Sequence, residues 1–237
     1  MDMSTVKGLA KAAVKQAFSL VTKREFEMQQ WNKRNERPIE YAFALDVLRD
    51  VCPKSVLDVG TGTTAWPSLL RTCGYVVTAI DNVEDYWPAG MFNRHWHVLN
   101  EDIRAPKSTQ QHDAITCLSV LEHIEESALA IRGMFSLLNR GGSLIVTCPY
   151  KEDEYVPNAY ALPNAGYGHN APYVCQQYDR SHVERWLSEN DAELVSQTYW
   201  RFFDGVYWTE GNALEPPKKA RKNTAHQISC MHFRKTR

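Results

Sequence analysis

Short apolar runs alternate with segments of helical periodicity through the middle of the chain. The helical segments are 67–73, with proline in its first turn, and 122–138, with apolar residues three and four positions apart before a turn at 139–142. The apolar runs are rich in β-branched residues and bounded by turn residues or an acid, as is typical of buried strands. They are 55–59, 75–80, 96–99, 113–118 and 143–148.

Strands that alternate with helices favour a parallel sheet with helices on both faces, because consecutive parallel strands need a crossover connection. Further along the chain, Asp179 or Ser181 is expected to cap a short helix that ends at Asn190. Two later runs, 194–203 and 225–233, are expected to be strands that complete the sheet. The sequence therefore predicts an α/β fold, Rossmann-like and doubly wound, with a mostly parallel seven-stranded sheet.

The flanks of this region differ from it. Residues 1–50 are expected to form N-terminal helices that cap the fold or gate an acceptor. Residues 51–237 are assigned to one domain, because no linker rich in Pro, Gly or Ser divides them. Within that domain, 151–178 has no period and is too long for a plain connection, and its five tyrosines favour an ordered lid over a disordered loop.

Composition narrows the class of protein. Of the 237 residues, 43% are hydrophobic, enough for a well-packed core, and the formal net charge of -1 predicts no global attraction to nucleic acid. The six cysteines form no CxxC pair, which argues against a zinc ribbon and favours a reducing, cytoplasmic location. No apolar run is long enough for a membrane span, and lysines interrupt the apolar N-terminal stretch, so neither an anchor nor a secretory signal is expected.

The turn after the first predicted strand carries the strongest chemical signal, in VLDVGTGTTAW at 56–66. Ligands of open parallel sheets bind beyond the carboxyl ends of the strands, and Gly60 and Gly62 allow a tight turn with close backbone approach. The segment fits the dinucleotide pattern G-x-G-x-x-A, with Asp81 near the spacing of a ribose-binding acid. Asp58 opposes this interpretation, because its carboxylate would repel a pyrophosphate and attract a ligand that carries a sulfonium and an ammonium.

Polar residues follow the other predicted strands as well. Asp81 closes the second strand, where it can accept hydrogen bonds from a ribose diol. Asp102 and Ile103 follow the third strand, which places an acid for an amino group beside an apolar side chain for an adenine face. The stretch SVLEHI, at 119–124, follows the fourth strand, opposite the sulfur end of such a ligand.

Together these segments resemble the class I S-adenosylmethionine-dependent methyltransferases. VLDVGTGT is similar to the first motif of that family, VTAID to the second, NEDI to the third, HDAITCLSVLEHI to the motif after strand four, and LLNRGGSLIVTCPY to the fifth strand. The resemblance covers about residues 50–150 and departs from the family at position 64, where Thr replaces a frequent glycine. It implies S-adenosylmethionine as the cofactor. The residues that it assigns to the cofactor are Asp58, Gly60, Thr61 and Gly62 for the methionine moiety, Asp81 with Asn82 for the ribose, Asp102 and Ile103 for the adenine, and Ser119 and Val120 for the wall of the site.

A hydroxyl acceptor needs a base to remove its proton, and His123 is the first candidate because it lies just beyond the fourth strand. The competing interpretation is that His123 begins the next helix and faces solvent or a carbonyl group. His169 and His182 are the alternative bases, and an amine acceptor would need none. Tyr41, Tyr150 and His169 are expected to contact the acceptor.

No metal is expected in this site. The fourth strand ends in Leu118 and Ser119 rather than in the paired acids of metal-dependent family members. His95 and His97 alternate along a strand edge and are interpreted as structural residues.

Two basic segments bear on partners. Residues 5–21 can form a helix with apolar residues on one side and Lys7, Lys11 and Lys15 on another, which suits either weak contact with a membrane surface or packing on the domain. From residue 215 onward, seven Lys or Arg stand against one acid. That excess suits phosphate binding on RNA or on a lipid-linked acceptor, or a solvated basic hairpin.

The leading hypothesis is metal-independent O- or N-methylation of a small molecule or saccharide. The segment YWRFFDGVYWTEGNALEPP adds a weaker resemblance to uncharacterised methyltransferases of bacterial saccharide and secondary-metabolite pathways. The alternatives are an RNA-modifying methyltransferase and a cofactor-binding regulatory protein without catalysis. The intact pair Asp58 and Asp81 argues against the last of these, and no oligomeric state is predicted.

Overall fold

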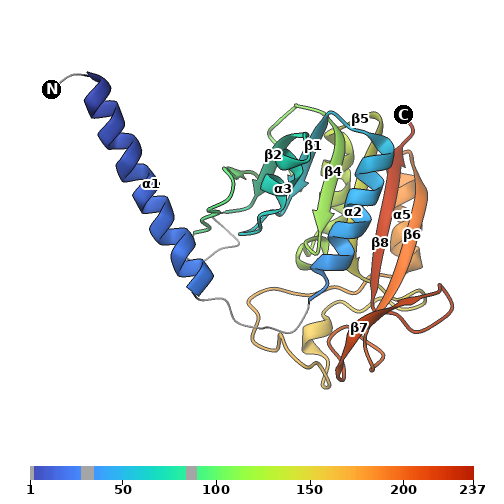
Figure 1. The fold of residues 1–237 in the computed structure, drawn as a ribbon. Helices are drawn as coiled ribbons and strands as arrows, with labels where there is room; N and C mark the ends of the chain where they lie inside the picture. Colours follow the sequence, from blue (N-terminus) through green and yellow to red (C-terminus); the bar gives the residue numbers. More distant parts are fainter. Residues whose placement is uncertain (1–2, 28–34, 84–89) are drawn as a thin grey trace. The chain divides into compact units, whose positions relative to one another are not determined.

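The computed structural model describes residues 3–27, 35–83 and 90–237 (Figure 1). The chain divides into two compact units, residues 1–35 and 36–237. The first contains helix α1 (Met3–Glu27), which includes the helix expected over 5–21. Helix α2 (Arg37–Val51) belongs to the second unit, where its buried residues join the core. None of the helices in the described ranges is long and apolar enough to cross a membrane.

The second unit is built on one sheet, which has eight strands among the described residues, in the order β3-β2-β1-β4-β5-β8-β6-β7. The first five in this order are parallel, whereas β8 runs antiparallel to β5 and β6, and β7 antiparallel to β6. The α/β fold class is therefore confirmed, with one strand more than expected. The strands are β1 (Ser55–Val59), β2 (Val76–Asp81), β3 (Leu99–Asn100), β4 (His112–Leu118), β5 (Leu138–Pro149), β6 (Ala192–Phe203), β7 (Ala213–Ala220) and β8 (Ile228–Lys235).

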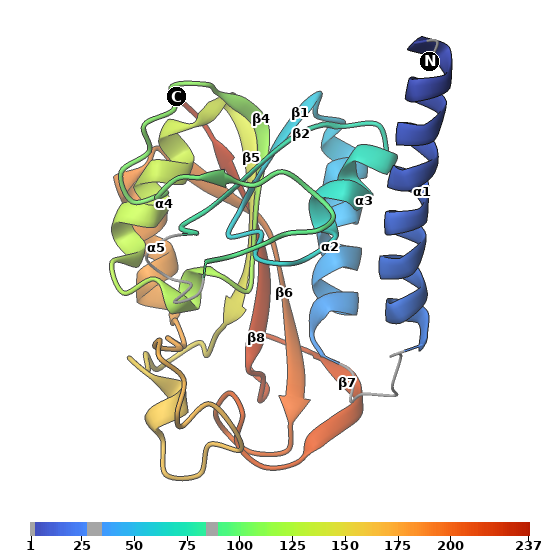
Figure 2. The same cartoon turned by 90° about the vertical axis from the view of Figure 1, so that its left-hand side faces the viewer.

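Helices cover both faces of the sheet (Figure 2). One face carries α2 and α3 (Trp66–Thr72), and the other carries α4 (Ser127–Ser136) and α5 (Arg180–Glu189). Successive residues of one strand face opposite cores, so Val56 packs with α2 and α3 while Leu57 packs with α4 and α5. This burial on both faces explains why the parallel strands have continuous apolar sequences.

The helix expected over 122–138 is interrupted. A short 3-10 turn, Leu121–His123, is followed by Ile124 in an extended conformation, and α4 begins only at Ser127. The segment after β5 holds this break, because the Tyr178 hydroxyl donates to the carbonyl oxygen of Leu121 and the Gln176 amide to that of Glu122. The turn expected at 139–142 lies within β5, at an irregularity in its pairing with β4.

The strand expected over 96–99 is shorter and lies later, as β3. The side chain of Asn93 accepts hydrogen bonds from the amides of His95 and Trp96, at 2.7 and 2.9 Å. These two amides therefore do not pair with a neighbouring strand.

The segment 151–178 is organised by isolated bridges and one 3-10 turn, Ala159–Ala161. Tyr150 pairs with Tyr178, and Val156 with Gln177, which brings the two ends of the segment together. Of the two expected caps of α5, Asp179 takes the position, because its carboxylate accepts a hydrogen bond from the amide of His182.

Candidate active site

The glycine turn joins β1 to α3 and is anchored on β2. The amides of Gly60 and Thr61 donate hydrogen bonds to the carbonyl oxygen of Ile80, at 2.9 and 3.4 Å. Gly60 and Gly62 have φ angles of +72° and +54°, in the left-handed region that favours glycine. A Cβ atom on Gly60 would lie 2.2 Å from a methyl carbon of Val120. Glycine is therefore required at position 60 by conformation and by space, and Val120 lies against the turn.

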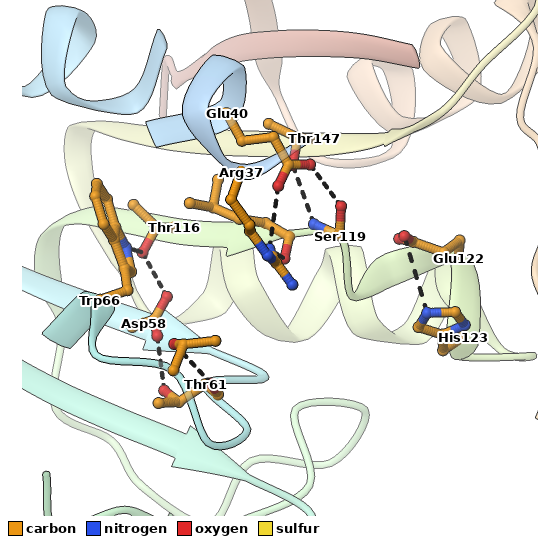
Figure 3. Close-up of polar contacts among 12 residues, drawn as sticks. Arg37, Glu40, Asp58, Thr61, Trp66, Thr116, Ser119, Glu122, His123 and Thr147 are labelled. Atoms are coloured by element: carbon orange, nitrogen blue, oxygen red, sulfur yellow. Dashed lines mark hydrogen bonds and ion pairs between the residues drawn. The ribbon is translucent and has the colours of Figure 1, made fainter. Parts of the chain in front are cut away.

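Asp58 is the last residue but one of β1, beside this turn, with 3% of its surface exposed. One carboxylate oxygen accepts a hydrogen bond from the Thr61 hydroxyl at 2.7 Å and the other from the Thr116 hydroxyl at 2.8 Å (Figure 3). The register of β1 and β4 pairs Asp58 with Thr116 and so makes the second bond. Burial raises the pKa of Asp58 from 3.8 to about 6, against both hydrogen bonds and the charge of Arg37. A ligand cation would stabilise this buried carboxylate.

Asp81 ties the end of β2 to the same turn, because its Oδ2 accepts a hydrogen bond from the Gly62 amide at 2.7 Å. Asn82 follows it and is half-buried. Asn93 closes the turn from the other side by donating from Nδ2 to the carbonyl oxygens of Gly62 and Thr64, at 2.8 and 2.9 Å. The sequence analysis missed Asn93, and its polar surroundings contain no pattern that singles it out.

Asp102 and Ile103 lie just beyond β3. Both carboxylate oxygens of Asp102 accept hydrogen bonds from the Arg104 guanidinium, the shortest at 2.7 Å, and this pairing lowers the pKa of Asp102. Ile103 is 4% exposed and belongs to the core on the α4 side. Its carbonyl oxygen faces Gly133 of α4, at a position where a Cβ atom would collide. The structure thus places the Asp102 carboxylate in an ion pair and the Ile103 side chain in the core.

A buried polar network fixes the segment after β4. Glu40 of α2 is fully buried and accepts hydrogen bonds from the Ser119 and Thr147 hydroxyls, the latter at 2.6 Å (Figure 3). Its other oxygen pairs with Arg37 at 3.1 Å, and Arg37 also donates to the carbonyl oxygen of Leu118 at 2.8 Å. Helix α2 therefore holds the carboxyl ends of β4 and β5 in place through these contacts. The spacing of Arg37 and Glu40, three residues apart, was a signal for this pair that the sequence analysis did not use.

Tyr41 also comes from α2 and stacks on Trp66, with ring centroids 4.4 Å apart. The Trp66 indole donates a hydrogen bond to the Thr116 hydroxyl at 3.2 Å, and that hydroxyl in turn donates to Asp58. The stacked rings are thereby connected to the Asp58 carboxylate. A small cavity lies at this point. Its lining includes Arg37, Tyr41, Asp58, Gly60, Thr61 and Leu118.

His123 lies in the 3-10 turn after β4 and does not begin a helix. Its Nδ1 is 2.7 Å from the carbonyl oxygen of Val174, which can only accept, so Nδ1 carries the proton and Nε2 presents its lone pair. Burial lowers the pKa of His123, which favours the neutral ring. Tyr173 meets the ring edge-on, with centroids 4.7 Å apart.

Glu122 is the buried neighbour of this histidine (Figure 3). Its Oε1 is 4.0 Å from Nε2 of His123, and within the described part of the chain its Oε2 has no hydrogen-bond partner. Burial raises the pKa of Glu122 well above its ordinary value. Like Asn93 and Glu40, Glu122 was not assigned a role from the sequence.

The remaining candidates are engaged elsewhere. Tyr150 is fully buried, and its hydroxyl donates to Glu152 at 2.9 Å. His169 Nε2 lies 2.8 Å from the carbonyl oxygen of Ala165, and His182 pairs with the capping carboxylate of α5. The structure brings Tyr41, but not Tyr150, into the lining of the cavity.

No group of three or more His, Cys, Asp or Glu side chains within residues 3–27, 35–83 and 90–237 could hold a metal ion. Of the two histidines near β3, His95 accepts a hydrogen bond from the Arg94 side chain at 3.1 Å.

The residues at the ends of β1, β2 and β4 fit S-adenosylmethionine. Asp58 is a buried carboxylate whose charge a cationic ligand would stabilise, and Asp81 is an acid at the end of the neighbouring strand. The turn between them takes a conformation that favours glycine at positions 60 and 62, and Val120 lies against it. An acid, a glycine turn and a second acid on this sheet define a class I S-adenosylmethionine-dependent methyltransferase.

The comparison with protein families agrees. A family model described as a methyltransferase domain matches residues 27–197. The chain therefore belongs to the methyltransferase domain family, whose cofactor is S-adenosylmethionine.

Among curated relatives, the ubiquinone biosynthesis O-methyltransferase of Stutzerimonas stutzeri (strain A1501) is 28% identical over 136 residues, which are 54% of this chain and 54% of that protein. The protein of the same name from Glaesserella parasuis serovar 5 (strain SH0165) is 25% identical over 187 residues, which are 70% and 76% of the two chains. The chain spans about half the length of most of the curated relatives that it matches.

Solved structures share the fold. The 1,6-didemethyltoxoflavin-N1-methyltransferase of Burkholderia thailandensis superposes with a TM-score of 0.58 at 14% identity and covers 96% of this chain and 90% of its own. The N-methyltransferase NodS of Bradyrhizobium japonicum WM9 gives a TM-score of 0.51 at 16% identity, with 85% and 88% covered.

Proposed function

We propose that the protein transfers the methyl group of S-adenosylmethionine to a hydroxyl or amino group of a small molecule or saccharide, without a metal. The observation that carries this proposal is the state of His123. Its Nδ1 is held by a carbonyl group, and its Nε2 faces the Glu122 carboxyl group at 4.0 Å, in the turn that follows β4, the strand that also supplies Thr116 to Asp58. This arrangement suits a base beside a bound methyl donor.

When bound, the cofactor supplies an electrophilic methyl carbon on a sulfonium, whose bonding electron pair returns to sulfur as the acceptor attacks. Asp58 and the turn at 60–62 would hold its amino-acid part, and Asp81 its ribose. Positioning of the two reactants accounts for much of the rate, with ~7–11 kcal/mol available in favourable cases. Arg37 and Glu40 contribute by holding the segment after β4 in place.

His123 would receive the hydroxyl proton at Nε2. Because burial lowers its pKa, the ring is neutral at pH 7 and can act as a base there. The contact between Nδ1 and the Val174 carbonyl group keeps the required tautomer. This role favours a hydroxyl over an amine, since an amine that attacks as the free base needs no such group.

Small acceptors are also favoured by the surroundings. Tyr160 and Tyr173, from the segment 151–178, lie near His123 with centroid distances of 6.3 and 4.7 Å, and such rings pack against cyclic acceptors. The names of the curated relatives and of the Burkholderia structure likewise describe methylation of small molecules. The basic strand β7 is separated from β4 by three strands of the sheet, which argues against the RNA alternative.

The test is transfer of labelled methyl from S-adenosylmethionine into a host extract that is afterwards separated into lipid, saccharide, RNA, protein and small-molecule fractions. We expect label in the small-molecule or saccharide fraction with the natural protein and a strong loss with His123→Gln. Label in RNA would replace this proposal by the RNA alternative. Absence of label in every fraction, with protein that binds the cofactor, would favour the regulatory alternative.

A further inference from the structure

Helix α1 presents a long apolar face. It has 25 residues and belongs to the compact unit of residues 1–35. Its large apolar side chains are exposed, with 59% of the surface of Leu9 and 65% of that of Leu20 accessible. Residues at the spacing of successive helical turns form one continuous strip. They are Val6, Leu9, Ala10, Ala13, Val14, Ala17, Leu20 and Val21.

A basic strip runs beside this face. Lys7, Lys11 and Lys15 recur every four residues and are exposed, so they follow one another along the helix. The helix contains two further basic residues, Lys23 and Arg24, and two acids in its last turn, Glu25 and Glu27, of which Glu27 pairs with Lys23 at 3.6 Å. Five basic residues against two acids give the helix a positive net charge, which repels a second copy of itself and attracts an anionic surface.

We propose that α1 binds the surface of an anionic lipid bilayer and lies in the plane of the interface. Its apolar strip would enter the boundary between headgroups and acyl chains, while the lysines extend their ammonium groups to the lipid phosphates. The apolar strip from Val6 to Val21 is about 22 Å long.

The test uses the full chain and two kinds of vesicle, one of phosphatidylcholine alone and one with roughly a third of phosphatidylglycerol, compared by flotation. The natural protein is expected to float with the anionic vesicles and to be released by salt. Replacing Lys7, Lys11 and Lys15 together by Gln should weaken binding about a hundredfold, since each basic residue near such a surface contributes about 1 kcal/mol. Replacing Leu9 and Leu20 by Gln should abolish binding while helix propensity is kept.

The matched control removes three charges from another exposed basic segment, by Lys218→Gln, Lys219→Gln and Arg221→Gln in or next to β7. This variant should float like the natural protein. Loss of binding in the control, full binding of the variant that lacks the three α1 lysines, or failure of the natural protein to float would each overturn the proposal. Circular dichroism and thermal unfolding of every variant ensure that a folding defect is not mistaken for lost binding. Failure would leave the methyltransferase proposal intact, because the vesicle assay does not depend on catalysis.

Discussion

The buried charge of Asp58 lowers the stability of the free protein, and the same charge is expected to strengthen cofactor binding. The substitution Asp58→Asn separates these two effects. Asn at position 58 has the shape of Asp, and its amide group can keep hydrogen bonds with the Thr61 and Thr116 hydroxyls, which both donate and accept. The substitution removes only the buried charge. Asp58→Asn should therefore stabilise the free protein at pH 7 and weaken its affinity for S-adenosylmethionine.

The magnitude follows from the pKa of this carboxyl group, which is 3.8 ordinarily and about 6 in the folded protein. Because the folded value is higher, the native state binds more protons than the unfolded state between these limits, and the free energy of unfolding falls as pH rises through them. The difference between the two values corresponds to about 3 kcal/mol at pH 7. Asp58→Asn should recover up to this amount, and nothing at a pH well below 3.8.

The assay is urea denaturation at a series of pH values, with calorimetric titration of S-adenosylmethionine at pH 7. Asp113→Asn is the matched control. Asp113 accepts hydrogen bonds from the Ser55 amide and the Asn139 side chain, and its pKa is lowered although burial acts to raise it. Its charge therefore stabilises the fold above the ordinary pKa of an Asp, and the same substitution should destabilise the protein at pH 7.

Opposite signs for the two Asp→Asn variants are the expected outcome. If the Asp58 variant is less stable than the natural protein at pH 7, the carboxylate is compensated in the free protein and the argument from burial is wrong. If that variant keeps the natural affinity for S-adenosylmethionine, Asp58 does not serve the cofactor.

Three further predictions concern the turn, the ribose acid and the base. Gly60→Ala should lower the free energy of unfolding by about 2–4 kcal/mol, from the positive φ and the collision with Val120. Gly141→Ala, with φ +76° and no atom within 4 Å of the added Cβ, should lose only about 1–2 kcal/mol, and equal losses in urea denaturation would disprove the collision. Asp81→Ala should weaken S-adenosylmethionine binding at least about tenfold in calorimetry, and an unchanged affinity would remove this residue from the site. His123→Gln should lower kcat with a hydroxyl acceptor and leave the cofactor affinity unchanged. Because the pKa of His123 is lowered, the rate of the natural enzyme should decline only below pH 6.5. A decline above that pH would contradict the assignment of His123 as the base.

Within the parallel half of the sheet, β1, β4 and β5 were predictable because each contains a run of buried, mostly apolar residues. β1 was expected with its observed bounds, and β4 within one residue. β7 was missed because it lies at the edge of the sheet, where two prolines and two lysines replace an apolar period. The prediction of one continuous helix over 122–138 was wrong for another reason. Hydrogen bonds from Gln176 and Tyr178 to residues 121 and 122 override the helical periodicity of the segment.

The positions of Asp58 and Asp81 on either side of the glycine turn were predictable in the same way. Asp58 and Asp81 stand at strand ends, and the fold brings them to one edge whatever the rest of the chain does. The contacts of Glu40 with Ser119 and of Asn93 with Gly62 could not be found this way, because they join residues 79 and 31 positions apart in the sequence. Contacts of that range depend on how the elements pack, and single-sequence patterns carry no record of it.

The most direct test of the account is a crystal structure of the protein with S-adenosylhomocysteine. The account predicts that the amino-acid part of the ligand lies at the turn 60–62 beside Asp58, with the ribose at Asp81 and the sulfur facing the segment that carries His123. A ligand bound elsewhere, or bound here with its sulfur turned away from His123, would contradict it.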